Sequence, residues 1–400
     1  MSEPKLRLHS LDALRGIAAL AVVFWHWQHF QLLGTSKLTW PPVSGGVDHA
    51  REPLYPLLRV FYEQGFVAVD LFFLISGFIF FWLYRDKLAG RKLSLVEFGV
   101  FRFSRLYPLH LATLLVVALL QFAFMKATGQ FFVYPSNDLK HFLASVLFIQ
   151  QGGDSAGFNG PEWSLTIEIM MYGVFCLLAR FGLLRNPMSS IAVVVIGLLI
   201  YARHENIARG LCGFFIGGLM FDLFEIVRRQ TAAKTFTAVF LLVSIVGWSL
   251  VVADIYAGGR ISDYFNGRLP LSMRGGLNLA VLYGLFPITL LTIALHEVLF
   301  GARYGGLAWL GEISYSSYLL HFPLQLVFAL IAVTGLLSAD AVRSPLGQLA
   351  YIGLLIPLSL LVFRLFEAPA QNALRAGWAT LSSAPALRGF GVVRERDRPG

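Results

Sequence analysis

Long hydrophobic segments separated by short polar stretches recur along nearly the whole chain. Most are close to the twenty or so residues that an α-helix needs to cross the hydrocarbon core of a membrane. Because that core offers no water to backbone polar groups, such segments are expected to be helical. The pattern therefore predicts an all-α fold, a polytopic membrane helical bundle with about ten transmembrane helices. The segments lie at about residues 11–33, 66–84, 104–125, 163–182, 189–203, 208–227, 235–255, 278–299, 309–333 and 348–367.

Composition supports this class of protein. The chain of 400 residues is 56% hydrophobic and only 14% charged, whereas about a quarter of the residues of a soluble protein are charged. The first hydrophobic segment is long and lacks a small-residue cleavage site, so we expect it to remain as a helix rather than be removed as a signal peptide. The cysteines, Cys176 and Cys212, both lie in hydrophobic segments and indicate neither a disulfide framework nor a metal site. We expect no metal and no bound cofactor.

The distribution of basic residues predicts the orientation of the chain. Much of the formal net charge of +9 lies in short loops and in the C-terminal tail, so it does not indicate a nucleic-acid partner. With ten spans, residues 1–10, 85–104, 228–234 and the tail fall on one side and are densely basic. Basic loops face the cytoplasm, so we expect a multi-pass protein of the plasma membrane, the inner membrane in bacteria, with both termini cytoplasmic. Residues 1–370 form the transmembrane domain, and residues 371–400 form a cytoplasmic basic tail that we expect to be disordered.

Two ionisable residues interrupt the first hydrophobic segment. Arg15 lies near its start, and His26 follows eleven residues later. This spacing is about three full helical turns plus roughly 20°, so both side chains project from one helix face, about 16 Å apart along the axis. Ionisable groups are costly inside a bilayer, so this face is expected to look into the protein or into a cavity. The alternative is that Arg15 reaches the membrane interface and His26 only packs.

A second pair of basic residues starts the third segment. Arg102 and Arg105 have an i, i+3 spacing, which places them on one face of a helix. Arginine makes bidentate contacts with phosphate oxygens, so these two residues, together with Arg15, are candidates to bind a phosphate-bearing ligand. The basic residues of the 85–92 loop are assigned to membrane topology rather than to ligand binding.

Histidines within the hydrophobic segments are candidates for proton transfer. A membrane interior disfavours the charged imidazolium and leaves a neutral imidazole that can accept a proton from a hydroxyl group. His26 fits this role, and Glu168 is a candidate to orient it or to stabilise a positive intermediate. His321 ends a helical run rich in serine and tyrosine; it belongs either to the same site or to the packed core. His29 is assigned to the membrane interface, and spacing alone does not tell which of these residues meet.

Six short motifs follow one another in order along the chain. They are Leu-Asp-x-Leu-Arg-Gly-x-Ala with Arg15-x10-His26, Phe-Phe-Leu-Ile-Ser-Gly-Phe in the second segment, Arg102-x-x-Arg105 with Pro108, Trp163-Ser-Leu followed by Glu168, Ile313-Ser-Tyr-x-x-Tyr-Leu-x-His321, and Phe366-Glu-x-Pro369. Each motif is weak alone, but the six in this order are specific. Together, over roughly residues 8–370, the chain resembles the acyltransferase family 3 membrane proteins.

The resemblance implies a membrane O-acyltransferase. Such an enzyme moves an acyl group, usually acetyl, from cytoplasmic acyl-CoA to a hydroxyl of an extracytoplasmic carbohydrate or glycolipid. Acetyl-CoA is then a co-substrate, and the partners are acyl-CoA, the acceptor and membrane lipid, with no nucleic acid and with the oligomeric state left open. His26 would act as the general base or acyl carrier, assisted by Glu168 and His321. The donor-binding residues would be Arg15, Arg102 and Arg105.

Two other functional classes fit the same residues. A transporter or flippase would use buried histidine and glutamate as a proton relay, although the internal inverted repeats typical of transporters are not apparent here. A scaffold or sensor would use these residues only for packing. Covalent modification of an acceptor separates the enzyme from both alternatives, whereas movement of an unmodified substrate favours the transporter.

Overall fold

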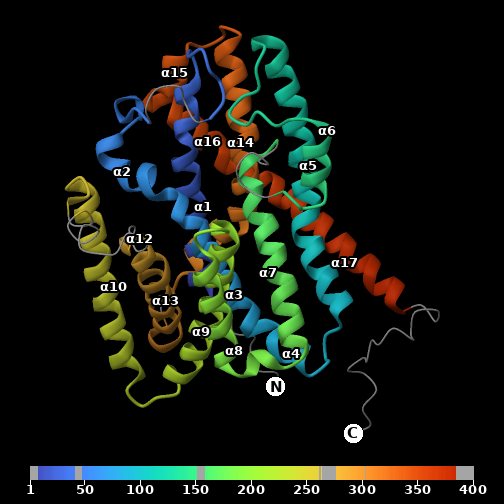
Figure 1. Cartoon of the computed structure of the whole chain (residues 1–400), viewed down its shortest axis with the longest axis vertical. Helices are drawn as coiled ribbons and strands as arrows, with labels where there is room; N and C mark the ends of the chain where they lie inside the picture. Colours follow the sequence, from blue (N-terminus) through green and yellow to red (C-terminus); the bar gives the residue numbers. More distant parts are fainter. Residues whose placement is uncertain are drawn as a thin grey trace.

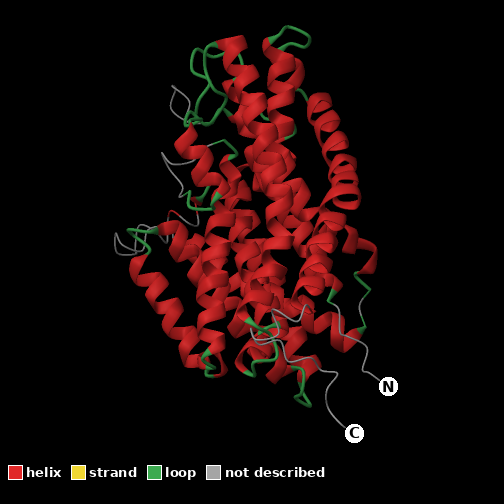
Figure 2. Ribbon diagram, turned by 90° about the vertical axis from the view of Figure 1, so that its right-hand side faces the viewer, coloured by secondary structure: helices red, strands yellow, loops and turns green. Residues whose placement is uncertain are grey.

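The computed structural model describes residues 8–40, 47–150, 158–260, 263, 276–301 and 303–383. In these residues the regular structure is helical, apart from one isolated bridge between Thr39 and Val133. Most of the helices run close to the long axis of the molecule (Figure 2). The all-α membrane bundle predicted from the sequence is therefore confirmed.

Each of the ten predicted segments corresponds to a helix or to consecutive helices. Within the described residues, eight helical spans are long and apolar enough to cross a membrane. The helices α1 and α8 have only 17 and 14 residues, so the exact count of ten spans is not established. The main helices are α1 His9–Trp25, α2 Tyr55–Gln64, α3 Ala68–Leu83, α4 Arg85–Ala89, α5 Leu95–Thr128, α6 Leu139–Val146, α7 Trp163–Arg180, α8 Pro187–Ile200, α9 Glu205–Val227, α10 Ala233–Tyr256, α12 Gly276–Ala280, α13 Phe286–Phe300, α14 Ala308–Val333, α15 Ala339–Arg343, α16 Pro345–Val362 and α17 Ala368–Ser383.

The first predicted helix changes type partway along its length. It is α-helical through α1 and then continues as a 3₁₀ helix, η1, over His26–Leu32, rather than as the single α-helix predicted there. At its start, the backbone amides of His9 and Ser10 donate hydrogen bonds to the Glu297 carboxylate at 3.0 and 2.9 Å. These bonds satisfy donors that the first turn of a helix leaves unpaired. His26 thus lies at the point where the helix tightens.

Two pairs of helices form the centre of the bundle in Figure 1, and glycine lets each pair approach closely. Helix α1 packs against α14, and α3 packs against α9. A Cβ atom at Gly16 of α1 would overlap Leu310 of α14, and one at Gly217 of α9 would overlap the backbone of Leu74 in α3. Only glycine fits such contacts, because it has no Cβ atom. The glycine that follows Arg15 in the first motif therefore serves helix packing.

Buried hydrophobic residues form two clusters within the bundle. One is built mainly from α1, α3, α7, α9 and α13, and the other from η1, the second half of α5, α14 and α16. The boundary between them crosses α1, since Val22 belongs to the first cluster and Val23 to the second. His26 follows one turn later, between two packed regions rather than at the centre of either.

The outer helices expose large hydrophobic side chains. Leu119, Leu199 and Leu242 are 71%, 79% and 62% exposed, respectively. Soluble proteins rarely expose extended apolar surfaces, whereas membrane lipid accommodates them. Helix α10, which carries Leu242, stands at the left edge of the bundle in Figure 1.

The C-terminal part of the chain remains helical beyond the predicted end of the transmembrane domain. After a π-helical turn, η9, at Phe363–Glu367, the chain continues as α17 to Ser383 and packs against α5. Arg375 of α17 donates a hydrogen bond to Ser104 Oγ of α5 at 3.2 Å. The first residues of the predicted disordered tail are therefore helical. Residues 384–400 lie outside the described residues, so the disorder expected for them stays a prediction.

Candidate functional site

Five of the six candidate residues line two neighbouring cavities. The first, the arginine cavity, has a volume of about 110 Å³, and the second, the histidine cavity, has a volume of about 300 Å³. Val69 and Tyr318 line both, so the two cavities meet at these residues. The arginine cavity is lined by Arg15, Arg102, Arg105, Glu168, Ser76, Phe80, Tyr172 and Tyr315, among others. The histidine cavity is lined by Trp25, His26, His29, Trp40, Phe66, Tyr134, Gly160, Trp163, Asn206 and Arg209, among others.

Aromatic and acidic neighbours hold the arginines of the first cavity. The Arg102 guanidinium lies over the rings of Phe80 and Tyr84, each with its centroid at 4.8 Å, and donates a hydrogen bond to the Tyr84 hydroxyl. Arg105 forms an ion pair with Glu367, with 3.4 Å between Nη1 and Oε1. Both cations come from the first half of α5 and face the same cavity as Arg15 of α1. The structure thus brings the three predicted donor-binding arginines together.

Glu168 lies with the arginines rather than with His26. Its Oε1 accepts hydrogen bonds from Ser76 Oγ at 3.2 Å and from the Tyr172 hydroxyl. It lines the arginine cavity and is not among the residues that line the histidine cavity. A carboxylate in this position partly offsets the repulsion among three guanidinium groups, so it acts on the cationic side of the site.

Two of the candidate histidines lie against each other with their ring nitrogens in defined roles. The ring centroids of His26 and His321 are 4.8 Å apart. Nδ1 of His26 bonds the Val22 carbonyl at 2.9 Å, and Nδ1 of His321 bonds the Tyr318 carbonyl at 2.6 Å. A carbonyl only accepts, so each Nδ1 carries the proton, and in a neutral ring Nε2 is the proton acceptor. Nε2 of His321 is buried, and the described structure gives it no hydrogen-bond partner.

His29 joins this site, although the sequence assigned it to the membrane interface. It is 3% exposed, and its ring centroid is 4.9 Å from that of His26. Gln325 fixes both histidines: its amide nitrogen donates to the His26 carbonyl at 2.9 Å, and its oxygen accepts from Nδ1 of His29 at 3.0 Å. The i, i+3 spacing of His26 and His29 was the sequence feature that could have predicted that the two side chains lie together. The 3₁₀ turns of η1 carry His29 inward, because residues three apart lie above one another in that helix.

A buried ion pair that the sequence analysis did not single out borders the histidine cavity. Arg209 of α9 donates to both carboxylate oxygens of Asp70 in α3, at 3.0 Å from Nε to Oδ1 and 2.7 Å from Nη2 to Oδ2. Its guanidinium also lies over the Trp163 ring, 5.3 Å from the centroid. Both residues fall inside predicted hydrophobic segments, where ionisable side chains are rare and usually functional. The location of Asp70 and Arg209 within hydrophobic segments could therefore have marked them as candidate site residues from the sequence alone.

A second buried pair lies outside both cavities. His110 of α5 and Glu162 are each fully buried, with 3.4 Å between Nδ1 and Oε1. Nε2 of His110 donates to the Ser145 carbonyl at 2.9 Å. Because Glu162 immediately precedes Trp163, this pair anchors the start of α7 against α5. Its contacts are therefore those of a pair that holds two helices together.

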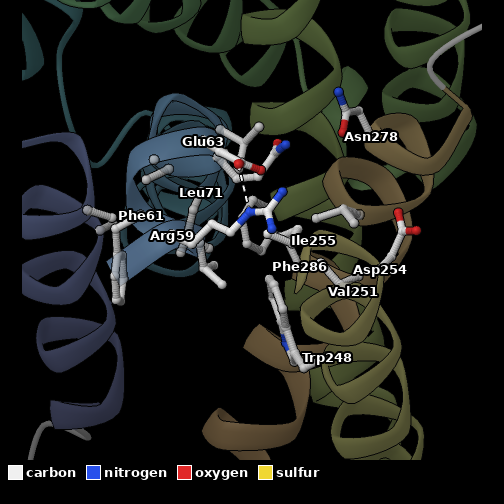
Figure 3. Close-up of a pocket in the computed structure, with 18 of the residues that line it drawn as sticks. Arg59, Phe61, Glu63, Leu71, Trp248, Val251, Asp254, Ile255, Asn278 and Phe286 are labelled. Carbon is white, nitrogen blue, oxygen red and sulfur yellow. Dashed lines mark hydrogen bonds and ion pairs between the residues drawn. The ribbon is translucent and has the colours of Figure 1, made fainter. Parts of the chain in front are cut away.

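A further cleft contains none of the candidate residues. It has a volume of about 570 Å³ and lies among α1, α2, α3, α10 and α13. Figure 3 shows Trp248, Val251 and Phe286 on its apolar walls, with the ion pair of Arg59 and Glu63 at one side. Its size alone does not make it a reaction site, because no histidine lines it. Within the described residues, no cluster of three or more histidine, cysteine or carboxylate side chains is arranged to hold a metal ion.

Comparison with known proteins shows what this chain is similar to. A family model described as an acyltransferase domain matches residues 8–364. The chain is 32% identical over 180 residues to the acyltransferase MdmB of Streptomyces mycarofaciens, which is 44% of this chain and 40% of that protein. It is 24% identical over 353 residues to the peptidoglycan O-acetyltransferase OatA of Listeria monocytogenes, which is 79% of this chain and 49% of that protein.

A third relative is the exopolysaccharide production protein ExoZ of Rhizobium meliloti. It is 34% identical over 141 residues, which is 34% of this chain and 39% of that protein. The chain therefore spans less than half the length of each of these three relatives. No solved structure matches the chain.

Proposed function

The chain belongs to this acyltransferase domain family, and on that premise we propose that it is a membrane O-acyltransferase. It transfers an acyl group, most simply acetyl, from acyl-CoA on the cytoplasmic side to a hydroxyl of a carbohydrate or glycolipid on the other side. The observation that carries the proposal is the pair of adjoining cavities, one lined by three arginines and the other by His26. The name of OatA, a peptidoglycan O-acetyltransferase, supports acetyl as the group.

The arginine cavity is proposed to bind the donor. Acyl-CoA carries several phosphate groups, and guanidinium groups bind phosphate oxygens through paired hydrogen bonds. Arg15, Arg102 and Arg105 present three such groups to one cavity. Arg15 of α1 and His26, the residue that directly follows α1, are about 16 Å apart along the helix axis. A long donor can therefore be held by charge at one end while its thioester reaches the junction between the cavities.

His26 is proposed to activate the acceptor. With its proton on Nδ1, its Nε2 takes the proton of the acceptor hydroxyl as that oxygen attacks the thioester carbonyl carbon. The carbon–sulfur bond then breaks, and Nε2 returns the proton to the departing CoA thiolate. In the covalent variant, Nε2 attacks the thioester carbon first, and the carbon–sulfur bond breaks to release the CoA thiolate. The acceptor oxygen then takes the acyl group as the carbon–nitrogen bond breaks, and the hydroxyl proton passes through the freed Nε2 to the thiolate. Both variants need Nε2 to face the histidine cavity as a lone pair.

His321 and Glu168 are proposed to assist from different sides. His321 packs against His26 and offers an unbonded Nε2, so it can support the imidazolium that forms during the reaction. Glu168 is placed among the arginines and is proposed to balance their charge when the donor is absent. In this proposal the three predicted catalytic residues are divided: His26 and His321 act on the acceptor side, and Glu168 acts on the donor side.

The test compares acyl transfer by wild-type protein with that of two histidine variants. Membranes that contain the chain receive acetyl-CoA labelled in the acetyl group, and mass spectrometry follows the label into glycans and glycolipids. General base catalysis by one side chain is worth about 10²–10⁴-fold, so His26→Ala should lose at least that much transfer while remaining inserted. His296→Ala is the matched control, since His296 lies on α13 outside both cavities. Full activity in folded His26→Ala, or transport of an unmodified glycan, would contradict the proposal and favour the transporter.

A further inference from the structure

We propose that the histidine cavity binds one uncharged sugar ring, stacked on aromatic side chains and hydrogen-bonded by Asn206 and Arg209. The proposal rests on the proposed function for its link to catalysis, and it narrows the acceptor from carbohydrates in general to a neutral ring at a defined place. Three features of the cavity support the proposal: its aromatic walls, the loop contacts that fix Trp40 and Tyr134, and the charges of its lining residues.

The walls of the histidine cavity are rich in aromatic side chains. A sugar ring has apolar C–H faces and polar hydroxyl edges, so it pairs an aromatic face with hydrogen-bonding groups at the side. Small-molecule sites are likewise mostly apolar, with a few placed polar groups, and about 300 Å³ is at the lower end of their size range. That volume suits one ring better than a longer oligosaccharide. The aromatic wall consists of Trp25, Trp40, Phe66, Tyr134, Trp163 and Tyr318.

Two of the aromatic residues are preorganised by contacts between distant loops. The backbone nitrogen of Trp40 donates to the Val133 carbonyl at 2.9 Å, which places Trp40 next to the residue before Tyr134. The isolated bridge of Thr39 and Val133 joins the same two loops. Gly160 lies directly against the Tyr134 ring, because a Cβ atom there would overlap ring atoms. Such fixed side chains lose little entropy when a ligand binds.

The charge balance favours a neutral ligand. Among the residues that line the cavity, Arg209 is the lone aspartate, glutamate, lysine or arginine. Its charge is already balanced by Asp70 through hydrogen bonds to both carboxylate oxygens. A carboxylate or phosphate on the ring would therefore have no unpaired cation to bind in the cavity. It would also be repelled by Asp70, the carboxylate that pairs with Arg209. Neutral hydroxyls can instead use the Asn206 amide, to which the described structure gives no hydrogen-bond partner, and the guanidinium edge.

The location of His26 connects ring binding to the reaction. His26 lines the cavity together with the aromatic residues, and its Nδ1 is occupied by the Val22 carbonyl. The remaining Nε2 is therefore the ring nitrogen that can meet a hydroxyl of the bound sugar. A ring stacked in the cavity thus brings a hydroxyl to Nε2 of His26 at the start of η1.

Binding is tested without an acyl donor, using the whole chain in lipid nanodiscs. The probes are methyl glycosides of glucose, galactose and mannose, each paired with its uronic acid counterpart, and the readout is saturation-transfer NMR titration. At least one neutral glycoside should bind about tenfold more tightly than its uronic acid. Trp40→Ala and Asn206→Ala should each weaken that binding about tenfold, while Trp309→Ala, a partly exposed tryptophan outside the cavity, should leave it unchanged. Absence of binding, unaffected binding in the cavity variants, or a preference for the uronic acids would overturn the proposal.

The charge argument has its own test. Asp70→Asn removes the anion and leaves Arg209 as an unbalanced cation, so the preference should shift toward the carboxylated sugar by about tenfold. If that variant fails to fold, Asn206→Asp adds a carboxylate to the cavity; it should weaken uronic acid binding more than neutral glycoside binding and so raise the preference for the neutral ring. Unchanged selectivity in whichever of these variants folds would refute the assignment of a neutral ring.

These measurements separate the ring site from the proposed function. Sugar binding that depends on Trp40 and Asn206, together with no acyl transfer, would retain the ring site and reject the acyltransferase. Acyl transfer that depends on His26, with acceptor KM unchanged in Trp40→Ala and Asn206→Ala, would retain the acyltransferase and reject the ring site.

Discussion

Gln325 shows how single side chains hold the histidine site together. It is fully buried and uses both ends of its amide, one for the His26 carbonyl and one for His29. The two bonds also fix its orientation, because the nitrogen must face a carbonyl and the oxygen must face an N–H group. Gln325 is therefore a positioning residue for two histidines at once.

We predict that Gln325→Leu strongly lowers acyl transfer and lowers thermal stability only slightly. The change leaves Nδ1 of His29 without its acceptor and removes the side-chain donor to the His26 carbonyl, and an unsatisfied buried polar group costs about 1–3 kcal/mol. Initial rates of transfer and the apparent melting temperature in detergent measure the two effects. Gln325→Glu is the conservative partner: it retains an acceptor for His29 and should keep more activity than the leucine variant. Equal activity in the wild type and both variants would remove Gln325 from the site.

The arginines yield a prediction about the donor. Hydrogen bonds to charged groups are worth about 1.5–3 kcal/mol, and about 1.4 kcal/mol is tenfold in affinity. Arg102→Gln should therefore raise the KM for acetyl-CoA about tenfold or more and leave the KM for the acceptor nearly unchanged. Lys92→Gln, which removes an exposed charge in the neighbouring loop, is the control and should behave as wild type. A rise in acceptor KM instead would place Arg102 on the other side of the reaction.

At the residue scale, the sequence predicted which ionisable residues face a cavity better than it predicted which of them are neighbours. Arg15, Arg102 and Arg105 line one cavity. The sequence could group them because helical spacing and ionisable side chains can both be read from short stretches of sequence. Glu168 could not be placed from the sequence, since its partner helices come from distant segments. The pair of Asp70 and Arg209 was also beyond spacing rules, because the two residues lie 139 positions apart.

At the scale of elements, close helix crossings define the centre of the bundle. Gly77 of α3 and Gly217 of α9 face the backbone of the opposite helix, and a Cβ atom at either would overlap it. Helices that meet through small residues gain van der Waals contact and are common inside membranes. The α3–α9 crossing also positions Asp70 and Arg209, one on each helix, and so supports the wall of the histidine cavity.

We predict that Gly217→Ala destabilises the protein, whereas Gly353→Ala does not. Overpacking a fixed contact costs about 1–3 kcal/mol or more, and the backbone of Leu74 cannot move aside without shifting α3. Gly353 of α16 has no neighbouring atom within 4 Å of an added Cβ, so alanine should be neutral or stabilise by less than about 1 kcal/mol. Apparent melting temperatures in detergent compare the two. A Gly217→Ala protein as stable as wild type would mean that the crossing is looser than described.

Hydrophobic length predicted the helices but not their internal changes. All ten predicted segments are helical where the structure describes them, because a membrane-spanning segment has few other ways to satisfy its backbone. The switch to 3₁₀ geometry at His26 and the π turns at Val281–Leu285 and Phe363–Glu367 were not predicted. Such local changes depend on tertiary contacts, and π turns often mark functional positions. Helix α17 was missed because its sequence is only moderately apolar.

At the scale of the whole molecule, the two cavities lie toward loops that the predicted topology places on opposite sides of the membrane. Arg102 and Arg105 lie near the start of α5, close to the basic loop that precedes it, whereas the histidine cavity lies beside the 34–40 and 130–134 loops. These two groups of loops fall on opposite sides in the predicted topology. A donor held by arginines and an acceptor held by aromatic residues would then approach the Tyr318 junction from opposite faces.

We predict that the loop before α5 is cytoplasmic and that the loop after η1 is not. A membrane-impermeant thiol reagent should label the Ser36→Cys variant in intact cells and should label Lys92→Cys only after the cells are broken; both residues are exposed. The parent chain gives the background, because Cys176 and Cys212 lie within α7 and α9. The reverse labelling pattern would place the arginine cavity on the outer side, where acyl-CoA is not available. The donor assignment would then fail even if His26 proved essential, so this experiment tests orientation separately from chemistry.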